Sequence, residues 1–500
     1  MSSKVKINLS ELLFDITIAP PISITGISDD SRSIKKGNVF FACKGESSHG
    51  LDFLESVLMV GAIAVIYEKP YDLSKLKSCT VPLIGIEGLR EYMGEIANRW
   101  YNFPSKNMEI IGITGTNGKT TVAWLIQNCL SLLGNKCAYI GTLGSGVGLL
   151  NKGDLTTPSC FDLHQKLSAY REMGIKYVAI EVSSHSIAQN RIAGLSFGAT
   201  IFTNLSRDHL DYHGDYESYG STKAKLFINV DSKIKIINCN DSFGRKLLKQ
   251  INNKAVTIIK GQPPKNFNEE YLSILSSKAN KFGHTVSLKS TWGEKSFHFP
   301  LIGEFNIENA AQVIALISSY KFNFNNILHA MENVSPPQGR MELIDLSMND
   351  LVPSVFVDFA HTPEALKEAL LALRLHYKRK IWCVFGCGGD RDKGKRKLMG
   401  RMAKTYADRV VITSDNPRSE TPESIISDIL LGSKNDVHTI VNRASAINYA
   451  IRSANNADVI LIAGKGHEDY QLIKDKRIEF SDELVSRKAI KIRLRELKND

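Results

Sequence analysis

Residues 108–134 read MEIIGITGTNGKTTVAWLIQNCLSLLG, and the rest of the chain is interpreted from this stretch. The β-branched residues at 110–113 indicate a short strand. Apolar residues at three- and four-residue steps beyond Thr121 indicate an amphipathic helix that stops at Gly134. The glycines between them let backbone N–H groups face outward, and a helix N-terminus adds partial positive charge. The stretch therefore predicts a strand, a polyphosphate-binding loop and a helix.

The loop supplies candidate ligands for the phosphates of a nucleotide. They are Gly115, Thr116, Asn117, Gly118, Lys119, Thr120 and Thr121. Lys119 is expected to reach the β/γ-phosphates and Thr120 to hold Mg²⁺. The ordinary phosphate loop has its first glycine five positions before the second, where this chain has Ile113. A glycine pair alone would indicate a tight turn, but the Gly-Lys-Thr-Thr ending between a strand and a helix favours nucleotide binding.

Length and composition indicate a multidomain protein of the cytoplasm. A chain of 500 residues should form two to four domains, and 43% hydrophobic with 23% charged residues is typical of globular proteins. No apolar run approaches the ~18 residues of a membrane span, and the first residues lack the layout of a signal peptide. Eight cysteines without a CxxC pair favour reduced thiols.

The formal charge of +11 raises the question of a nucleic-acid partner. The basic residues are scattered among acidic ones, which favours a solvated surface that also attracts small anionic substrates. The basic run at 390–397 could otherwise suggest a nucleic-acid patch. We expect no nucleic acid, no membrane span and a monomer.

The chain predicts an α/β fold of three domains. We expect a small α/β N-terminal domain at 1–104, a central ATPase-like domain with a phosphate loop and a mostly parallel sheet at 105–336, and a Rossmann-like C-terminal domain at 337–500. The pattern breaks at 101–105 and at Pro336-Pro337. Beyond 337, strands at 354–360, 380–389, 409–414 and 458–466 alternate with helices at 363–376, 397–406 and 422–431.

Two strands of the central domain end in polar residues. The buried run Tyr177–Glu181 ends in a carboxylate, and residues 199–214 open into a loop with Asn, Asp and His. Ligands in open α/β sheets lie outside the carboxyl ends of strands, and Mg²⁺ prefers oxygen ligands, so Glu181 is a candidate ligand. His209 alone would more often be a surface or core residue.

Seven segments together are similar to motifs of the Mur ligases, which couple ATP to amide-bond formation. They are GTNGKTT at 115–121, NLSRDHLD at 204–211, YGSTKAKLF at 219–227, GEFNIEN at 303–309, GRME at 339–342, DFAHTP at 358–363 and GKGHE at 464–468. The resemblance covers nearly the whole chain. It implies ATP as co-substrate and Mg²⁺ as cofactor.

The resemblance assigns roles around the nucleotide. It places Asn306 near the adenine, adds Arg340 and Asp358 to the nucleotide contacts, and gives Thr120, Glu181, His209 and Lys223 to the metal ions. It implies that CO₂ carboxylates Lys223 to a carbamate, which makes it an anion able to bind a second Mg²⁺. The residues alone do not choose between Lys223 and Lys225.

The resemblance also assigns substrate contacts. Those to the UDP-sugar fall on Ser31, Thr156, Thr157, Ser183, Gln189 and Arg191, and more loosely on Glu46, Ser47 and Ser48. Leu155 and Pro158 depart from the family pattern. Asp415, Asn416, Pro417 and Arg418 resemble the motif that marks meso-diaminopimelate addition, with Arg391, Gly464 and Glu468 as further contacts. Arg418 can clamp the distal carboxylate that lysine lacks; alone, this segment could be a turn with an exposed arginine.

The implied activity is addition of meso-diaminopimelate to UDP-N-acetylmuramoyl-L-alanyl-D-glutamate in peptidoglycan biosynthesis, and hence a role in cell shape and division. ATP phosphorylates the D-glutamate γ-carboxylate, and the amine attacks the acyl phosphate. Three alternatives stay open: the same ligation with L-lysine, a folylpolyglutamate synthase-like ligase, and a non-enzymatic phosphate-loop switch or nucleic-acid-dependent ATPase. The last would need a coherent basic groove with stacking aromatic residues.

Overall fold

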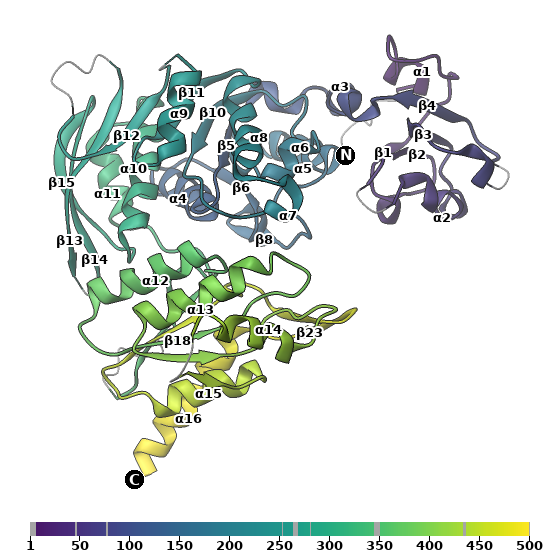
Figure 1. The fold of residues 1–500 in the computed structure, drawn as a ribbon. Helices are drawn as coiled ribbons and strands as arrows, with labels where there is room; N and C mark the ends of the chain where they lie inside the picture. Colours follow the sequence, from purple (N-terminus) through teal and green to yellow (C-terminus); the bar gives the residue numbers. More distant parts are fainter. Residues whose placement is uncertain are drawn as a thin grey trace. The chain divides into compact units, whose positions relative to one another are not determined.

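The computed structural model describes residues 7–45, 48–76, 79–252, 254–263, 269–280, 282–344, 351–433 and 437–499 (Figure 1). Its contacts divide the chain into two compact units. Unit 1 comprises Met1–Gly112, Lys136–Thr200 and Lys225–Lys233, and unit 2 comprises Ile113–Asn135, Ile201–Ala224 and Ile234–Asp500. Glu46 and Ser47, two of the looser UDP-sugar candidates, lie outside the described residues.

Unit 1 begins with a four-stranded parallel sheet. Its strands, in spatial order, are β1 (Gly26–Ser28), β2 (Asn38–Ala42), β3 (Ala64–Lys69) and β4 (Leu83–Glu87). Alternate residues of β2 face opposite sides, since Val39 and Phe41 belong to one core and Phe40 and Ala42 to another. Helix α3 (Leu89–Tyr101) contributes to the first core and α2 (Leu54–Val60) to the second.

The remainder of unit 1 contains the strand that ends at Glu181. The strands β9 (Tyr177–Glu181), β6 (Cys137–Gly141), β7 (Gly144–Val147) and β8 (Leu149–Asn151) follow one another in the sheet, with β6 and β9 parallel. Helix α5 (Cys160–Glu172) packs against α3. The division between the units runs through β5 (Glu109–Thr114), β10 (Phe197–Phe202), α8 (Tyr216–Ile228) and β11 (Ser232–Asn238).

In unit 2, the phosphate loop leads into α4 (Lys119–Leu132), which packs against α10 (Glu304–Ser319). Strand β11 pairs in parallel with β12 (Val256–Lys260), and an antiparallel meander of β13 (Tyr271–Asn280), β14 (Gly283–Ser290) and β15 (Gly293–Phe299) continues the sheet. This meander was not predicted from the sequence. Helices α9 (Ser242–Gln250) and α11 (Phe324–Met331) complete the region.

The C-terminal part of unit 2 is a Rossmann-like layer structure, as predicted. Its sheet has the order β16 (Glu342–Leu343), β17 (Ser354–Asp358), β21 (Val459–Ala463), β18 (Ile381–Phe385), β19 (Arg409–Ile412) and β20 (His438–Thr439). All neighbours are parallel except β16. Helices α12 (Pro363–His376), α13 (Gly394–Tyr406) and α14 (Pro422–Leu430) pack on one face, and α15 (Arg443–Ser453) and α16 (Asp482–Asn499) on the other.

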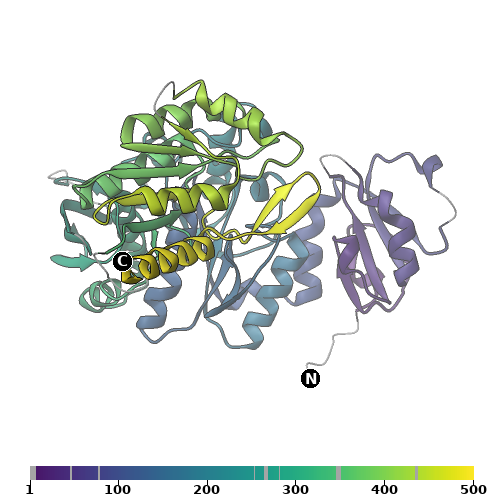
Figure 2. The ribbon, with the colours of Figure 1, turned by 90° about the horizontal axis from the view of Figure 1, so that it is seen from below.

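The predicted helix at 363–376 coincides with α12, whereas α13 begins three residues before the predicted 397. The hairpin of β22 (Tyr470–Ile473) and β23 (Lys476–Glu479), yellow in Figure 2, was not predicted, nor were β20, α15 and α16. The domain boundaries at 104 and 336 stay predictions. No helix of the described residues is long and apolar enough to cross a membrane.

Candidate active site

The phosphate loop joins β5 to α4, and its two glycines have positive φ. Gly115 has φ +149° and Gly118 has φ +87°. A Cβ on Gly115 would lie 1.9 Å from Thr203 Oγ1, and one on Gly118 would lie 2.6 Å from Asn309 Oδ1. Both positions therefore require glycine, for conformation and for space.

Side chains of the segment after β10 form hydrogen bonds with the backbone of this loop. Asn117 N donates to Asn204 Oδ1 at 3.0 Å, and Asn204 Nδ2 donates to Asn117 O at 3.1 Å. Thr203 Oγ1 also donates to Asn117 O, at 2.6 Å. The loop is thus held in place by its neighbour before any phosphate binds.

Two lysines share one carbonyl of the loop. Lys119 Nζ donates to Gly115 O at 2.8 Å, and Lys223 Nζ donates to the same oxygen at 2.9 Å. The Lys223 side chain is 1% exposed and lies over the Tyr219 ring at 4.6 Å. Burial, reinforced by the charge of Lys119, lowers the pKa of Lys223 well below its usual value. Lys225, in contrast, is exposed. The two lysines between which the sequence did not choose therefore differ in burial.

His209 belongs to a small polar cluster next to the loop. Its Nε2 lies 3.3 Å from Asp208 Oδ2, and His361 Nε2 lies 4.0 Å from the same oxygen. Partial burial lowers the pKa of His209 to about 4, against the opposing effect of Asp208, so the imidazole is neutral at pH 7. A neutral imidazole is the form that can bind a metal ion.

Glu181 is fully buried at the end of β9. Its carboxylate accepts hydrogen bonds from the Tyr139 hydroxyl, from Thr142 N at 2.9 Å and from Thr142 Oγ1 at 3.1 Å. Glu181 belongs to unit 1, whereas Thr120, His209 and Lys223 belong to unit 2. The four-residue metal set therefore stays a prediction.

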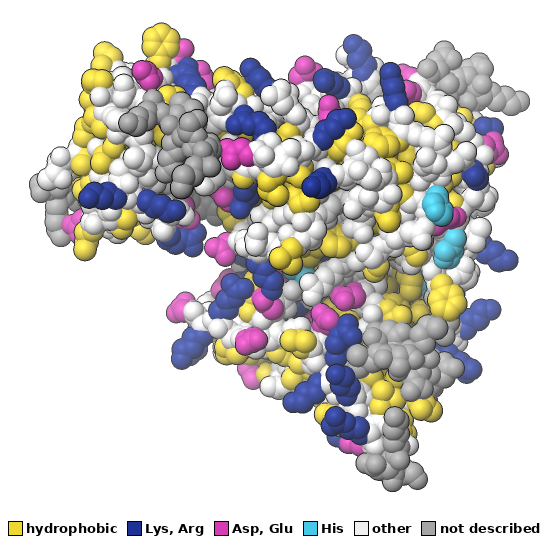
Figure 3. Space-filling view, turned by 180° about the vertical axis from the view of Figure 1, so that it is seen from behind, with side chains coloured by type: hydrophobic (Ala, Val, Ile, Leu, Met, Phe, Trp, Pro, Cys, Tyr) yellow, Lys and Arg dark blue, Asp and Glu magenta, His cyan; other side chains and the backbone are white. Residues whose placement is uncertain are grey.

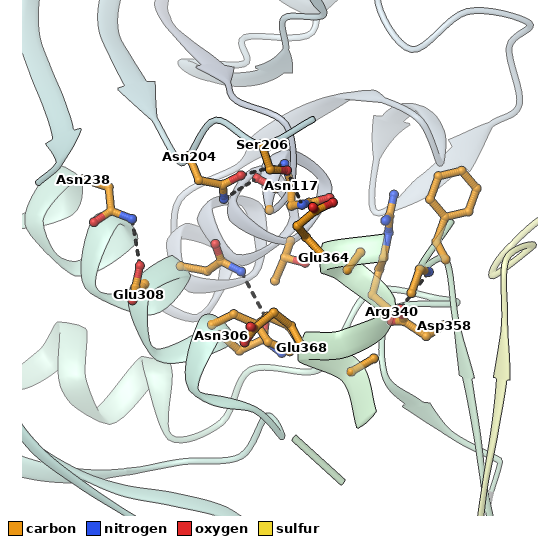
Figure 4. Close-up of a pocket in the computed structure, with 18 of the residues that line it drawn as sticks. Asn117, Asn204, Ser206, Asn238, Asn306, Glu308, Arg340, Asp358, Glu364 and Glu368 are labelled. Carbon is orange, nitrogen blue, oxygen red and sulfur yellow. Dashed lines mark hydrogen bonds between the residues drawn. The ribbon is translucent and has the colours of Figure 1, made fainter. Parts of the chain in front are cut away.

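A pocket of about 240 Å³ lies beside the phosphate loop, within unit 2 (Figure 4). Its walls come from the loop, the segments after β10 and β17, and helices α10 and α12. Among its lining residues are Asn117, Gly118, Thr121, Asn204, Asn306, Glu308, Arg340, Asp358, Glu364 and Glu368. Asn306, Arg340 and Asp358, predicted as nucleotide contacts, thus share one cavity with three residues of the loop.

Arg340 and Asp358 occupy fixed positions in this pocket. Arg340 Nη2 donates to Thr120 Oγ1 at 2.9 Å, and its guanidinium carbon lies 4.4 Å from the centre of the Phe359 ring. Asp358 accepts from Met341 N at 2.7 Å and Ala360 N at 2.8 Å. Burial raises the pKa of Asp358, although Arg340 opposes the shift.

A second group of predicted residues meets at the C-terminal sheet. The segments after β18, β19 and β21 bring Arg391, Asp415–Arg418 and Gly464 to the same edge, as expected for parallel strands. A Cβ on Gly464 would lie 2.5 Å from Asp415 Oδ2, so the two segments are in close contact. Burial raises the pKa of Asp415, but the charges of Lys465 and Arg443 lower it overall, so Asp415 is an anion at pH 7.

Lys465, to which the sequence analysis gave no role, is at the centre of this group. Its Nζ, fully buried, donates to Asn416 Oδ1 at 3.1 Å and to Glu468 Oε2 at 2.7 Å. Asn416 Nδ2 donates to the same Glu468 oxygen at 2.9 Å. The sequence feature that could have indicated a role for Lys465 was its position in the GKGHE segment.

Arg418 lies near Arg391. Arg418 has φ +51°, and its Nη1 donates to Gly389 O at 2.8 Å. Burial, and next the positive charge of Arg391, lower the pKa of Arg418. Asp415 and Glu468 are near enough to oppose this shift. Two neighbouring guanidinium groups can donate charge-assisted hydrogen bonds to the same anion.

Unit 1 contains a further cavity of about 730 Å³. Ser31, Ser48, Gln189 and Arg191, four of the UDP-substrate candidates, line it, as does Leu155. Thr157 and Ser183 are linked to it indirectly: Arg191 Nη1 donates to Thr157 O at 3.0 Å, and Thr157 Oγ1 lies 3.4 Å from Ser183 Oγ. Thr156 Oγ1 lies 3.2 Å from Thr142 Oγ1.

Comparisons with known proteins identify the family of this chain. Family profiles described as "Mur ligase family, catalytic domain", "Mur ligase middle domain" and "Mur ligase, glutamate ligase domain" match residues 23–101, 113–317 and 339–466. The UDP-N-acetylmuramoyl-L-alanyl-D-glutamate–2,6-diaminopimelate ligase of Haemophilus influenzae is 39% identical over 485 residues, 96% of this chain and 97% of its own length. The chain belongs to the Mur ligase family.

Two further relatives carry the same description. The enzyme of that name from Coxiella burnetii is 40% identical over 475 residues, 94% of this chain and 96% of its own length. A solved structure of a UDP-N-acetylmuramoyl-L-alanyl-D-glutamate–2,6-diaminopimelate ligase is 33% identical and covers 98% of this chain and 99% of its own, with a TM-score of 0.67. The three-domain α/β fold expected for a Mur ligase is therefore confirmed.

Proposed function

We propose that this Mur ligase adds meso-diaminopimelate to the γ-carboxylate of D-glutamate in UDP-N-acetylmuramoyl-L-alanyl-D-glutamate, with ATP as co-substrate. This reaction would place it in peptidoglycan biosynthesis. The observation that carries the proposal is the neighbouring pair Arg391 and Arg418, at the same sheet edge as Asp415 and Glu468. Such a site offers cations for a distal carboxylate and anions for an amine, which is the charge pattern of a diamino dicarboxylic acid.

The first step is transfer of the γ-phosphoryl group of ATP to the substrate carboxylate, which gives an acyl phosphate and ADP. The glycine loop and the N-terminus of α4 would bind the phosphates, with Lys119 neutralising the charge that moves during transfer. The pocket lined by Asn306 and Asp358 would hold the nucleoside. These residues act mainly by positioning and by electrostatic stabilisation.

In the second step the free amine of diaminopimelate attacks the acyl carbon, loses a proton, and the tetrahedral intermediate expels phosphate. Asp415 and Glu468 would orient the ammonium and amine group, while Arg391 and Arg418 would hold the distal carboxylate by charge-assisted bonds. The site thus presents one amine to the acyl phosphate and keeps the other end of the amino acid fixed.

The candidate ligands fit Mg²⁺ in their chemistry. Thr120 and Glu181 offer oxygen, His209 offers a neutral nitrogen, and Lys223 offers oxygen only as a carbamate. The lowered pKa of the buried Lys223 favours the neutral amine that reacts with CO₂. Mg²⁺ bound there would neutralise the phosphate oxygens and the developing charge.

For the UDP-substrate, the cavity of unit 1 is the proposed site. Arg191 and Gln189 lie in its wall, where Arg191 would donate charge-assisted hydrogen bonds to a diphosphate or carboxylate, and Ser31 adds a hydroxyl donor. Arg191 is held by Gln189 Oε1, which accepts from its Nε at 3.0 Å. Thr156, Thr157 and Ser183 would contribute through the adjoining hydrogen-bond network.

The alternatives are less well supported. Lysine lacks the carboxylate that the arginine pair would bind. Binding of lysine would therefore leave the positive charge of the arginines partly buried without that carboxylate. Lys and Arg side chains are interspersed with Asp and Glu on the face shown in Figure 3, which does not favour a nucleic-acid groove. We further propose that the protein works in the cytoplasm as a monomer on small-molecule substrates.

The experiment is an assay of ADP release with UDP-N-acetylmuramoyl-L-alanyl-D-glutamate, ATP, Mg²⁺ and meso-diaminopimelate, each omitted in turn. Full turnover is expected only with all components, and the product should be the UDP-muramoyl tripeptide by mass spectrometry. Replacement of diaminopimelate by lysine should slow the reaction strongly. ADP release that needs no amino acid would contradict the ligase.

A further inference from the structure

Arg396 is a charged residue with no exposed surface, outside the predicted contacts of the substrate. It lies in the first turn of α13. Its guanidinium donates to both oxygens of Glu420, from Nη1 at 2.9 Å and from Nη2 at 2.7 Å. Nη1 also donates to Asp428 at 2.9 Å, and Nη2 to Gly388 O at 3.3 Å. One side chain therefore joins α13, α14 and the segments after β18 and β19.

Glu420 extends these contacts toward Asp390. Glu420 Oε1 accepts from Asp390 N at 2.7 Å, and the Asp390 carboxylate accepts from Ser419 N at 3.1 Å and Ser419 Oγ at 2.6 Å. The backbone follows the same path, because Gly389 N donates to Asn416 O at 2.9 Å. A Cβ on Gly389 would lie 1.9 Å from Pro417 O. Gly389 and Asp390 of one segment are thus joined to residues 416–420 of the other.

The joined segments carry the two arginines of the amino-acid site. Arg391 is the residue after Asp390, and Arg418 is the residue before Ser419. Their like charges repel, and a Cβ built on Gly388 would lie within 4 Å of both Arg418 Nη1 and Arg391 Cγ. If both guanidinium groups are to bind one carboxylate, other contacts must hold them close together against this repulsion.

We propose that Arg396 and Glu420 are positioning residues that fix the separation of Arg391 and Arg418, and so set the preference for an amino acid with a distal carboxylate. This inference rests on the proposed function. Neither residue touches the amino acid in this scheme. Their effect reaches it through the two segments that they join, as an outer shell of contacts orients the groups that bind a ligand.

The pair is well suited to this role by its geometry. A bidentate carboxylate fixes both the distance and the plane of a guanidinium, which a single hydrogen bond does not. Loss of Glu420 leaves the buried Arg396 with Asp428 as its remaining carboxylate partner, and loss of Arg396 removes two of the hydrogen bonds that fix Glu420. In either case the segments are expected to move apart. The ATP pocket lies beside α10 and α12 and shares no lining residue with this cluster.

The test uses the full-length protein with Glu420→Gln and Arg396→Lys. We expect each to raise the KM for meso-diaminopimelate about tenfold or more, because charge-assisted contacts to the distal carboxylate weaken. The KM for ATP and the kcat/KM for lysine should change less than about threefold. The ratio of kcat/KM values for the two amino acids should therefore fall by about tenfold.

Two comparisons separate positioning from a general loss of stability. Glu496→Gln breaks an exposed ion pair with Arg452 in the same domain and should leave the ratio unchanged. In an Arg418→Ala background, Glu420→Gln should have little further effect on the ratio, because the residue through which it acts is gone. If Glu420→Gln does not fold, Ser419→Ala removes one bond to Asp390 and provides the same test.

The outcomes are distinct. Wild-type protein that uses neither amino acid would overturn the proposed function and this inference with it. Wild-type protein that prefers diaminopimelate, with a preference fully retained in Glu420→Gln, Arg396→Lys and Ser419→Ala, would overturn the inference alone. Effects that add fully in the Arg418→Ala background would also overturn it, since the pair would then act elsewhere.

Discussion

Replacement of Lys223 tests whether this buried lysine works as a cation or as an anion. Lys119 Nζ and Lys223 Nζ donate to one oxygen at 2.8 Å and 2.9 Å, so they lie at most 5.7 Å apart, the sum of the two lengths. At an effective dielectric constant of ~20, two unit charges at about that distance interact by roughly 3 kcal/mol. As an ammonium, Lys223 would be repelled by Lys119 with about that energy. As a carbamate, it would be attracted to Lys119.

Carbamate formation joins the neutral Lys223 amine to CO₂ and releases a proton, so the side chain changes from a repelling to an attracting partner of Lys119. Loss of an interaction of roughly 3 kcal/mol in the transition state corresponds to about a hundredfold lower kcat. We expect that loss in Lys223→Ala and in Lys223→Met, the second of which preserves most of the buried volume. Lys225→Ala, on the same helix but exposed, is the matched control.

The assay is kcat for ligation, with and without added acetate or formate, and with bicarbonate removed or restored. A short carboxylic acid should partly restore Lys223→Ala by supplying the missing anion, and wild-type activity should depend on bicarbonate. Carbon-13 from labelled bicarbonate should give a carbamate NMR signal that disappears in Lys223→Ala. A fully active Lys223→Ala protein, or an inactive Lys225→Ala protein, would refute the assignment.

Three other perturbations follow from the site and the core. Lys119→Ala should abolish ATP-dependent ligation while the unfolding midpoint stays within a few degrees; unchanged ADP release would contradict the nucleotide assignment. Arg418→Ala should lower kcat/KM for meso-diaminopimelate by roughly a hundredfold and reduce the difference from kcat/KM for lysine, with the KM for ATP nearly unchanged. A preference for diaminopimelate that is fully retained would contradict binding of the distal carboxylate by Arg418. His284 is fully buried, and burial lowers its pKa to about 4. As the pH falls, His284 therefore becomes protonated at a higher pH in the unfolded chain than in the folded protein. The free energy of unfolding should drop by about 2 kcal/mol between pH 7 and pH 5. Urea denaturation should show a shallower pH dependence in His284→Gln, whereas His329→Gln, with 81% of the side chain exposed, should match wild type.

The phosphate loop and α12 could be predicted because their signals are local. Positive φ at Gly115 and Gly118 follows from the turn that the loop must make, and the boundaries of α12 follow from a Thr-Pro start and apolar spacing. The meander β13–β15 was missed although β14 alternates polar and apolar residues from 285 to 289. Its strands pair with partners whose register depends on the rest of the sheet, and the turns between them carry no Asn-Gly or Asp-Gly signal.

The choice between Lys223 and Lys225 could have been made from helix geometry. Tyr219, Lys223 and Phe227 recur at four-residue steps, and all three are buried. Lys225 lies off that stripe. A lysine aligned with two buried aromatic residues on a helix is more informative than either motif position alone, because burial of an amine demands a chemical reason.

The contacts that would space Arg391 and Arg418, the two arginines proposed to bind the substrate, could not be predicted from the sequence in the same way. Arg396 lies in DKGKRKLMG at 392–400, where four basic residues indicate a solvated face, yet Arg396 alone of these four is fully buried. Its burial depends on Glu420, 24 residues further along the chain and in another segment. A residue that binds substrate is recognised by its own chemistry, whereas a residue that spaces two others is recognised only when the fold brings its partners together. Selectivity in this ligase is therefore expected to change through substitutions at buried charges that no local motif includes.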